Sequence, residues 1–149
     1  MTTLPPKQAY LTMTTFLDKL WERTRGPGEL GLLCDMCLYI EDGQGSWDRA
    51  MWFDWLAWVK KLQTGVLVPE NTGERSALTA DMMKPLEPEQ AYLAMFAFIE
   101  EYWLRVNRPA ELGDLLSLMR YTPGAGTADP SMWDTWLAAI EKVQADRPA

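Results

Sequence analysis

The chain has 149 residues, a formal charge of −7 and no histidine. This length suits one compact domain, and an apolar fraction of 48% with eight tryptophans excludes an intrinsically disordered chain. No basic patch is visible in the sequence, so nucleic acid is not an expected partner. The acidity instead suits a basic protein partner, or it serves only to keep the protein soluble.

Signals for a membrane or for export are not visible along the chain. No apolar run approaches the ~20 residues that a transmembrane helix requires, so we expect no membrane partner. The opening residues, Met-Thr-Thr-Leu-Pro-Pro, lack the basic and apolar regions of a secretory signal. The only two cysteines, Cys34 and Cys37, give no disulfide framework. We therefore expect a cytoplasmic protein, and we expect it to be monomeric when free.

Three helices are predicted in residues 1–65. The first begins at Pro6, because proline is favoured in a first helical turn, and ends at the Gly-Pro-Gly around Pro27. The second runs from Pro27 to about Ile40 and is followed by a loop. The third is expected to be N-capped by Asp48 and to end before Gly65, which suits a left-handed C-cap.

Residues 66–86 are predicted to form a linker after this first unit. Val66-Leu67-Val68 is the only short β-like run of the chain, and Pro69 ends it. One or two helical turns are expected between residues 77 and 83.

Three more helices are predicted in residues 87–149. Pro88 and Pro109 open the first two of these helices, and Asp129 caps the third. A loop is expected from residue 121 to residue 126, where turn-forming residues are concentrated.

The two predicted units have similar sequences. Gln8-Ala-Tyr-Leu11 returns as Gln90-Ala-Tyr-Leu93, a spacing of 82 residues. Further matches at this spacing, or at one residue less after a slip in a loop, pair Phe16 with Phe98, Trp21 with Trp103, Arg23 with Arg105, Gly31 with Gly113, Tyr39 with Tyr121, Trp52 with Trp133 and Trp55 with Trp136. Because each unit alone would bury a small core, we expect an all-α fold in which two tandem three-helix repeats pack into one compact domain. The sequence leaves open a two-fold or a translational relation between them.

Helical periodicity predicts the core face of the third helix in each unit. The core positions share one arc of a helical wheel; they are Trp52, Trp55, Leu56, Val59 and Leu62 in the first unit and Trp133, Trp136, Leu137, Ile140 and Val143 in the second.

Some matched positions differ in chemistry between the units. Phe53 and Trp58 lie outside the centre of the core arc, and their counterparts are Asp134 and Ala139. These two aromatic side chains either face the other repeat or form an exposed apolar patch for a partner. Asp114 stands where the first unit has a leucine, so it predicts a solvent-exposed face on the second helix of its unit.

The sequence contains no catalytic constellation. The absence of histidine removes the commonest general base and the commonest metal ligand. Cys34-Asp-Met-Cys37 is a CxxC pattern, but a zinc site would need two more ligands and a redox motif would need a βαβ context. Two reduced cysteines in an apolar helix are the simpler interpretation. We expect no cofactor, no metal and no enzymatic activity.

Two pairs of adjacent carboxylates remain. Glu100 and Glu101 are expected on a solvent-exposed helix face, because adjacent residues of a helix point apart. Glu41 and Asp42 fall in a loop, where they either contact a basic partner or simply belong to a polar loop.

Three segments of the second unit carry a resemblance to a known family. They are Glu89-Gln-Ala-Tyr-Leu-Ala-Met-Phe-Ala-Phe-Ile-Glu-Glu-Tyr102, Glu111-Leu-Gly-Asp-Leu-Leu-Ser117 and Ala128-Asp-Pro-Ser-Met-Trp-Asp-Thr-Trp-Leu-Ala-Ala-Ile-Glu-Lys142. These segments resemble small helical immunity proteins of bacterial contact-dependent and other polymorphic toxin systems. The resemblance covers most of the second unit, and the first unit looks like a more diverged copy. It implies a cytoplasmic protein that binds and blocks a cognate toxin domain.

The leading hypothesis is therefore a non-enzymatic binding protein, most specifically an immunity protein. The acidic residues expected to steer a basic toxin domain are Glu41, Asp42 and Asp114, and the aromatic residues expected to anchor it are Trp47, Phe53 and Trp58. The alternatives are an adaptor or phage-type inhibitor of another protein, and an enzyme or small-molecule binder with a pocket between the repeats.

Overall fold

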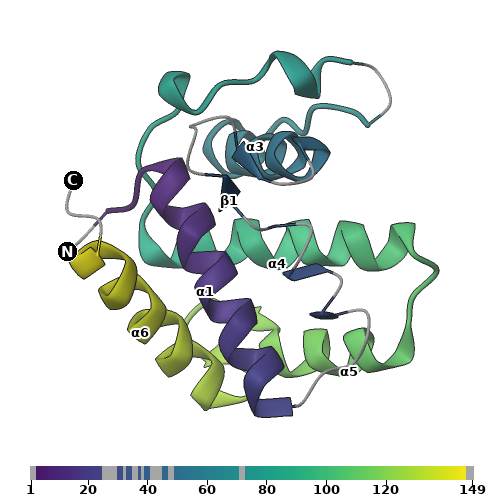
Figure 1. Cartoon of the computed structure of the whole chain (residues 1–149), viewed down its shortest axis with the longest axis vertical. Coiled ribbons are helices and arrows are strands. Elements are labelled where there is room, and N and C mark those ends of the chain that lie inside the picture. Colours follow the sequence, from purple (N-terminus) through teal and green to yellow (C-terminus); the bar gives the residue numbers. More distant parts are fainter. Residues whose placement is uncertain are drawn as a thin grey trace.

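The fold is mostly helical, which confirms the predicted all-α class. The computed structural model describes residues 3–24, 30–31, 33–34, 37, 39–40, 45–46, 49–70 and 73–146. Its long helices are α1 (Pro6–Thr24), α3 (Arg49–Thr64), α4 (Pro88–Arg105), α5 (Ala110–Met119) and α6 (Pro130–Asp146) (Figure 1).

The segment between α3 and α4 contains two short 3₁₀ helices, η1 (Arg75–Ala77) and η2 (Ala80–Met82). The helical turns expected between residues 77 and 83 are therefore present, although η1 begins two residues earlier. The β-like run at 66–68 forms no strand, and Val68 is buried instead. In Figure 1 this segment passes over α3 at the top of the molecule.

The structure has two small antiparallel hairpins where the sequence predicted a helix end and loops. One pairs β1 (Tyr39–Ile40) with β2 (Gly45–Ser46), and the other pairs β3 (Tyr121–Thr122) with β4 (Gly126–Thr127). The predicted second helix is thus wrong at its C-terminal end, because residues 39 and 40 join a hairpin. The predicted loop at 121–126 is wrong in the same way, since only its central turn, with Gly124 at a positive φ of 84°, is unpaired.

Most of the predicted helix boundaries are confirmed. Helices α1 and α4 begin at Pro6 and Pro88, and α5 begins one residue after Pro109. The Asp129 carboxylate accepts a hydrogen bond of 3.0 Å from the Ser131 backbone N–H at the start of α6. Gly65 ends α3 with a positive φ of 82°. The predicted cap of α3, Asp48, lies outside the described residues.

The long helices of the two halves pair reciprocally. Helix α1 packs along α6, and α3 packs along α4, so the first helix of each half lies against the last helix of the other (Figure 1). A translational relation between the halves would instead repeat one kind of contact in one direction. The reciprocal pairing favours a two-fold relation.

Two further contacts follow the same pattern. Leu4 and Leu86 form an isolated antiparallel bridge in which each backbone N–H donates to the other residue's carbonyl at 2.7 Å. These residues are 82 positions apart, the spacing of the sequence match, so equivalent residues meet each other. The indole N–H of Trp55 donates to the Pro6 carbonyl, and that of Trp136 donates to the Pro88 carbonyl, both at 3.1 Å.

A single core lies between the helices. The predicted core residues Trp55, Leu56, Val59, Trp136, Ile140 and Val143 are buried, while Trp52, Leu62 and Trp133 are half-buried against them. Leu137 is 38% exposed, so its assignment to the core was wrong. Tyr10 meets Trp55, and Phe16 meets Trp136, with ring centroids 5.9 and 5.6 Å apart in edge-to-face geometry.

Candidate protein-binding site

The predicted site residues do not form one group in the structure. Phe53 and Trp58 are half-buried on α3, and Asp114 is exposed on α5. Because α5 lies on the other side of α4 from α3, Asp114 is separated from the two aromatic residues (Figure 1). The remaining predicted contacts, Glu41, Asp42 and Trp47, lie outside the described residues.

A buried arginine organises the region beside Phe53. Arg75, in η1, is only 7% exposed. Its Nη1 donates to Asp54 Oδ1 at 2.9 Å, and Nη1 and Nη2 donate to Glu101 Oε1 and Oε2 at 2.8 and 3.0 Å. Its Nε donates to the Val68 carbonyl at 2.8 Å. One guanidinium therefore joins α3, α4 and the segment between them.

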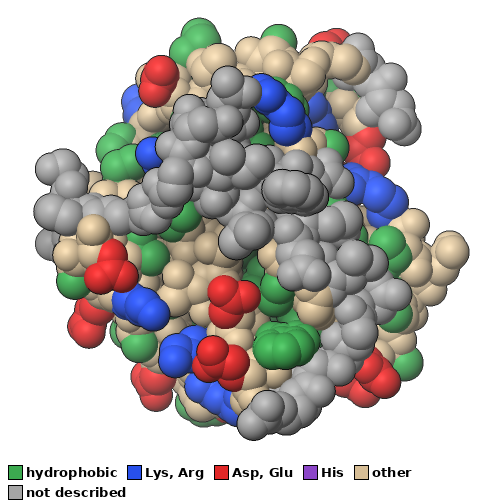
Figure 2. Space-filling model, in the orientation of Figure 1, with side chains coloured by type: hydrophobic (Ala, Val, Ile, Leu, Met, Phe, Trp, Pro, Cys, Tyr) green, Lys and Arg blue, Asp and Glu red, His purple; other side chains and the backbone are tan. Residues whose placement is uncertain are grey.

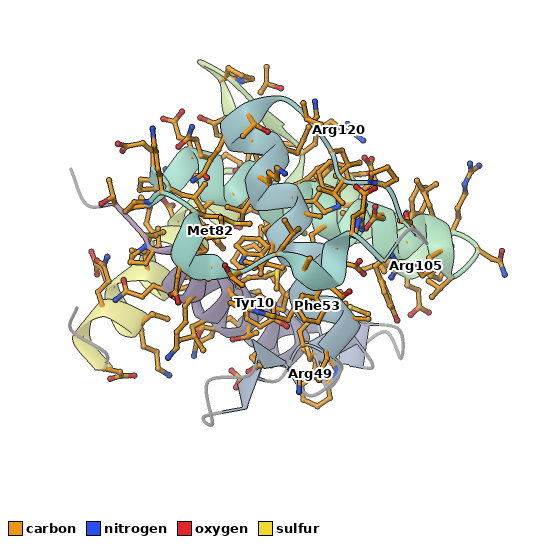
Figure 3. The ribbon with its side chains drawn as sticks, turned by 90° about the horizontal axis from the view of Figure 1, so that it is seen from above. Tyr10, Arg49, Phe53, Met82, Arg105 and Arg120 are labelled. Carbon is orange, nitrogen blue, oxygen red and sulfur yellow. The ribbon has the colours of Figure 1, made fainter. Side chains whose placement is uncertain are left out.

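A second arginine extends this ion-pair network to the surface. Arg105, at the end of α4, lies 3.1 Å from Asp54 Oδ2, 3.3 Å from Glu101 Oε1 and 3.4 Å from Glu70 Oε2. Figure 3 shows Phe53 on α3 and Arg105 on the same side of the molecule. The expectation that Glu101 belongs to a solvent-exposed face is wrong, because its side chain is only 10% exposed and is bound by both arginines.

The network contains three carboxylates and two guanidinium groups, so it carries one excess negative charge. Burial acts to raise the pKa of Glu101, but the hydrogen bonds from Arg75 bring it below its ordinary value of 4.5. The pKa of Glu70 moves the other way. Partial burial, and then the neighbouring Glu101 carboxyl, raise it above 4.5. Glu70 also has the longest ion pair of the network, 3.4 Å to Arg105, so the excess negative charge is least well compensated there.

A cavity of about 290 Å³ opens beside these charges. Its walls combine apolar surface with the charged groups of the network; the lining residues are Ala50, Phe53, Asp54, Glu70, Gly73, Arg75, Ser76 and Arg105. A volume of this size holds one long side chain of a partner, and the mixture of an aromatic ring with carboxylates suits a basic one.

Trp58 lies deeper in the same region than Phe53. It packs against the core, and its indole nitrogen is buried without a hydrogen bond of ordinary geometry. The indole N–H is nevertheless near enough to Glu101 to help lower the pKa of that carboxyl. Trp58 thus faces α4, across the contact between the two halves, whereas Phe53 lines the cavity.

No family model, curated protein or solved structure matches this chain. Within the described ranges, no group of three or more Cys, Asp or Glu side chains could hold a metal ion. Cys34 and Cys37 are not joined in a disulfide. None of the helices that the structure describes has the length and apolar character needed to cross a membrane.

Proposed function

We propose that this chain is a non-enzymatic protein-binding inhibitor, and most specifically an immunity protein that neutralises a cognate bacterial toxin by direct binding. The observation that carries the proposal is the cavity beside Phe53, where three carboxylates outnumber two arginines. The resemblance of the second unit to immunity proteins supports the same assignment.

The chemistry of the cavity favours a cationic side chain of the partner. A lysine or arginine that reaches Glu70 would supply the positive charge that the network lacks, and its methylene groups would pack on the Phe53 ring. Glu70 is the least compensated carboxylate and its side chain is 42% exposed, so it is available for this contact.

The network would also hold the site in place before binding. Arg75 donates three short hydrogen bonds to Asp54 and Glu101 and a fourth to the Val68 carbonyl. The cavity wall therefore needs little reordering when a partner binds. A preformed site loses less side-chain entropy on association, and this increases affinity. The net charge of −7 adds long-range attraction towards a basic toxin domain.

Co-expression with the neighbouring gene tests the immunity assignment, because an immunity gene lies beside its toxin gene. We expect the neighbouring product to stop growth and this chain to restore it. Glu70→Lys and Phe53→Asp should each abolish the rescue, since both place the wrong chemistry in the cavity. The matched control Glu111→Lys, at an exposed position of α5, should retain it. A harmless neighbour, or rescue that survives both cavity variants, would contradict the assignment.

A further inference from the structure

A second cavity, of about 400 Å³, lies on a different face, between α1 and α6. All the described residues that line it come from these two helices; they are Thr15, Lys19, Arg23, Asp134, Thr135, Ala138, Ala139 and Lys142. Figure 2 shows basic side chains among acidic ones over this part of the molecule, at the lower left. We call it the α1/α6 groove.

The α1/α6 groove is the counterpart of the groove between α3 and α4. Arg23 and Thr135 match Arg105 and Asp54 in the two halves of the sequence. Arg23 Nη2 donates to Thr135 Oγ1 at 3.1 Å, and Arg105 Nη1 lies 3.1 Å from Asp54 Oδ2. The same interhelical contact therefore spans both grooves.

The α3/α4 groove already contains the side chain of a residue from an irregular segment. The chain between α3 and α4 passes over α3, and its Arg75 side chain enters between Asp54 and Glu101. The molecule thus displays, within itself, how a groove of this kind takes up an irregular segment. A charged side chain at the centre of the segment meets groups of opposite charge on both helices.

The charges are reversed in the α1/α6 groove. Lys19 occupies the position of Glu101, and neutral Thr135 occupies that of Asp54. With Arg23 and Lys142, the lining carries three cations against one carboxylate, Asp134. Lys19 also pairs with Glu22 at 3.7 Å, but both side chains are more than half exposed, so this pair is weak and easily displaced.

The α1/α6 groove also has more free space. Ala139 stands where the α3/α4 groove has Trp58, so the volume that an indole fills in one groove is not filled by the matching side chain in the other. This difference leaves a cavity in which a peptide backbone could lie against the small side chains of Ala138 and Ala139.

We propose that the α1/α6 groove binds an irregular segment of a partner protein through an acidic side chain. The carboxylate would lie among Lys19, Arg23 and Lys142, in the place that corresponds to the Arg75 guanidinium of the other groove. A protein segment fits better than a nucleic acid, because the chain carries −7 overall and Asp134 interrupts the basic lining. This proposal concerns a different face and does not rest on the proposed function.

A peptide taken from the chain itself tests the proposal. The probe is a synthetic peptide of residues 66–78 that carries R75E, titrated into the full ¹⁵N-labelled chain and followed by NMR. We expect chemical-shift changes confined to α1 and α6. Lys19→Glu should weaken binding about tenfold or more, because it removes a charge-assisted hydrogen bond and adds repulsion. Lys84→Glu, an equal change of charge outside the groove, should leave it unchanged.

A charge exchange provides the reciprocal test. Lys19→Glu combined with Thr135→Asp rebuilds the two carboxylates of the α3/α4 groove, so the peptide with the natural Arg75 should now bind this variant. Ala138→Trp fills the groove from an exposed position and should block both peptides. The proposal is overturned by three results: no shift at millimolar R75E peptide, shifts that lie away from α1 and α6, or binding that Lys19→Glu does not weaken.

Discussion

Arg75 connects three parts of the molecule from a nearly buried position: α3, α4 and the segment between them. Asp54 and Glu101 come from different halves of the chain, and Arg75 donates hydrogen bonds to both at distances below 3.1 Å. Because all three side chains are nearly buried, the pairing depends on every partner being present. A buried charge without its partner is far more costly than the complete pair is stabilising.

Arg75→Met should lower the free energy of unfolding by about 3–5 kcal/mol, because it leaves two nearly buried carboxylates with the partly exposed Arg105 as their one cation in the network. Urea denaturation at pH 7 measures this loss. The control adds Asp54→Asn and Glu101→Gln to the same chain, which removes the stranded charges and should recover much of the stability. A loss below about 1 kcal/mol for Arg75→Met would show that the network is not structural.

Glu70 should give stability a pH dependence of its own. Its pKa in the folded protein is raised, so its protonated form is favoured, and its ionised form weakens folding above that pKa. Glu70→Gln should therefore make the protein no less stable at pH 7. The difference from the wild type should shrink as the pH falls from the raised pKa towards 4.5, the ordinary value. Thermal unfolding across this range measures the difference.

Glu101 should have the opposite effect on the pH dependence of stability. Its folded pKa is lowered, so its contribution is complete above 4.5 and is lost as the pH falls through the lowered value. The wild type and Glu70→Gln are compared as the pH falls from the raised pKa of Glu70 to 4.5. If both proteins lose the same amount of stability over this range, the raised pKa does not belong to Glu70.

Phe53 and Trp58 should separate into a surface role and a structural role. Trp58 packs at the contact between α3 and α4, so Trp58→Ala should cost roughly 3 kcal/mol, as other large truncations in a core do. Phe53 lines an open cavity, so Phe53→Ala should cost about 1 kcal/mol or less. Denaturant unfolding of the two single variants distinguishes them, and equal losses would place both side chains in the core.

The sequence predicted individual core residues better than it predicted the charged site. Asp54 is buried on α3, and a buried aspartate is a signal that a cation must lie nearby. The second unit does not repeat this signal, because Thr135 stands at the matched position. Arg75 could not be placed at all, because a residue of an irregular linker has no periodicity that fixes its position. Glu101 was misassigned for a related reason: its burial comes from Arg75 and not from its own helix.

At the level of elements, each half uses a tryptophan to hold its first helix. The Trp55 and Trp136 side chains are fully buried, and their indole N–H groups bind the carbonyls of Pro6 and Pro88 at the first residues of α1 and α4. The last helix of each half is thereby tied to the beginning of the first helix of that half.

Trp55→Phe and Trp136→Phe should therefore have similar effects. Each removes one buried hydrogen bond and part of an indole, for a loss of about 2–4 kcal/mol. Trp21→Phe is the matched control, since its side chain is 42% exposed and the change should stay within about 1 kcal/mol. Chemical denaturation of the three variants makes the comparison. Losses for the two buried tryptophans that differ by more than about 2 kcal/mol would show that the two bonds are not equivalent.

Helix starts were predictable, whereas the hairpins were not. Prolines and a capping aspartate mark the starts of α1, α4 and α6 by their own stereochemistry, within one or two residues. Each hairpin strand has only two residues, which is too short for an alternating pattern of apolar and polar side chains. Turn residues at 123–126 indicated a change of direction but could not show that the flanking residues pair.

At the level of the whole molecule, the two halves share one core through reciprocal helix pairs. Matching sequences predicted two similar units but not which helix of one meets which helix of the other, because the same apolar faces satisfy either arrangement. The pairing of α1 with α6 and α3 with α4 produces two equivalent grooves. Arg75 of the linker enters one of them, and this asymmetry gives the molecule two chemically different faces.

Affinity capture from a lysate of the native cell at moderate salt tests the central claim that the cavity beside Phe53 is a protein-binding site. Wild type, Glu70→Lys and the surface control Glu111→Lys are captured in parallel and the bound proteins are quantified by mass spectrometry. We predict one stoichiometric partner with a basic domain, retained by wild type and by the control and lost from Glu70→Lys. A partner retained equally by Glu70→Lys, or no stoichiometric partner at all, would contradict the claim.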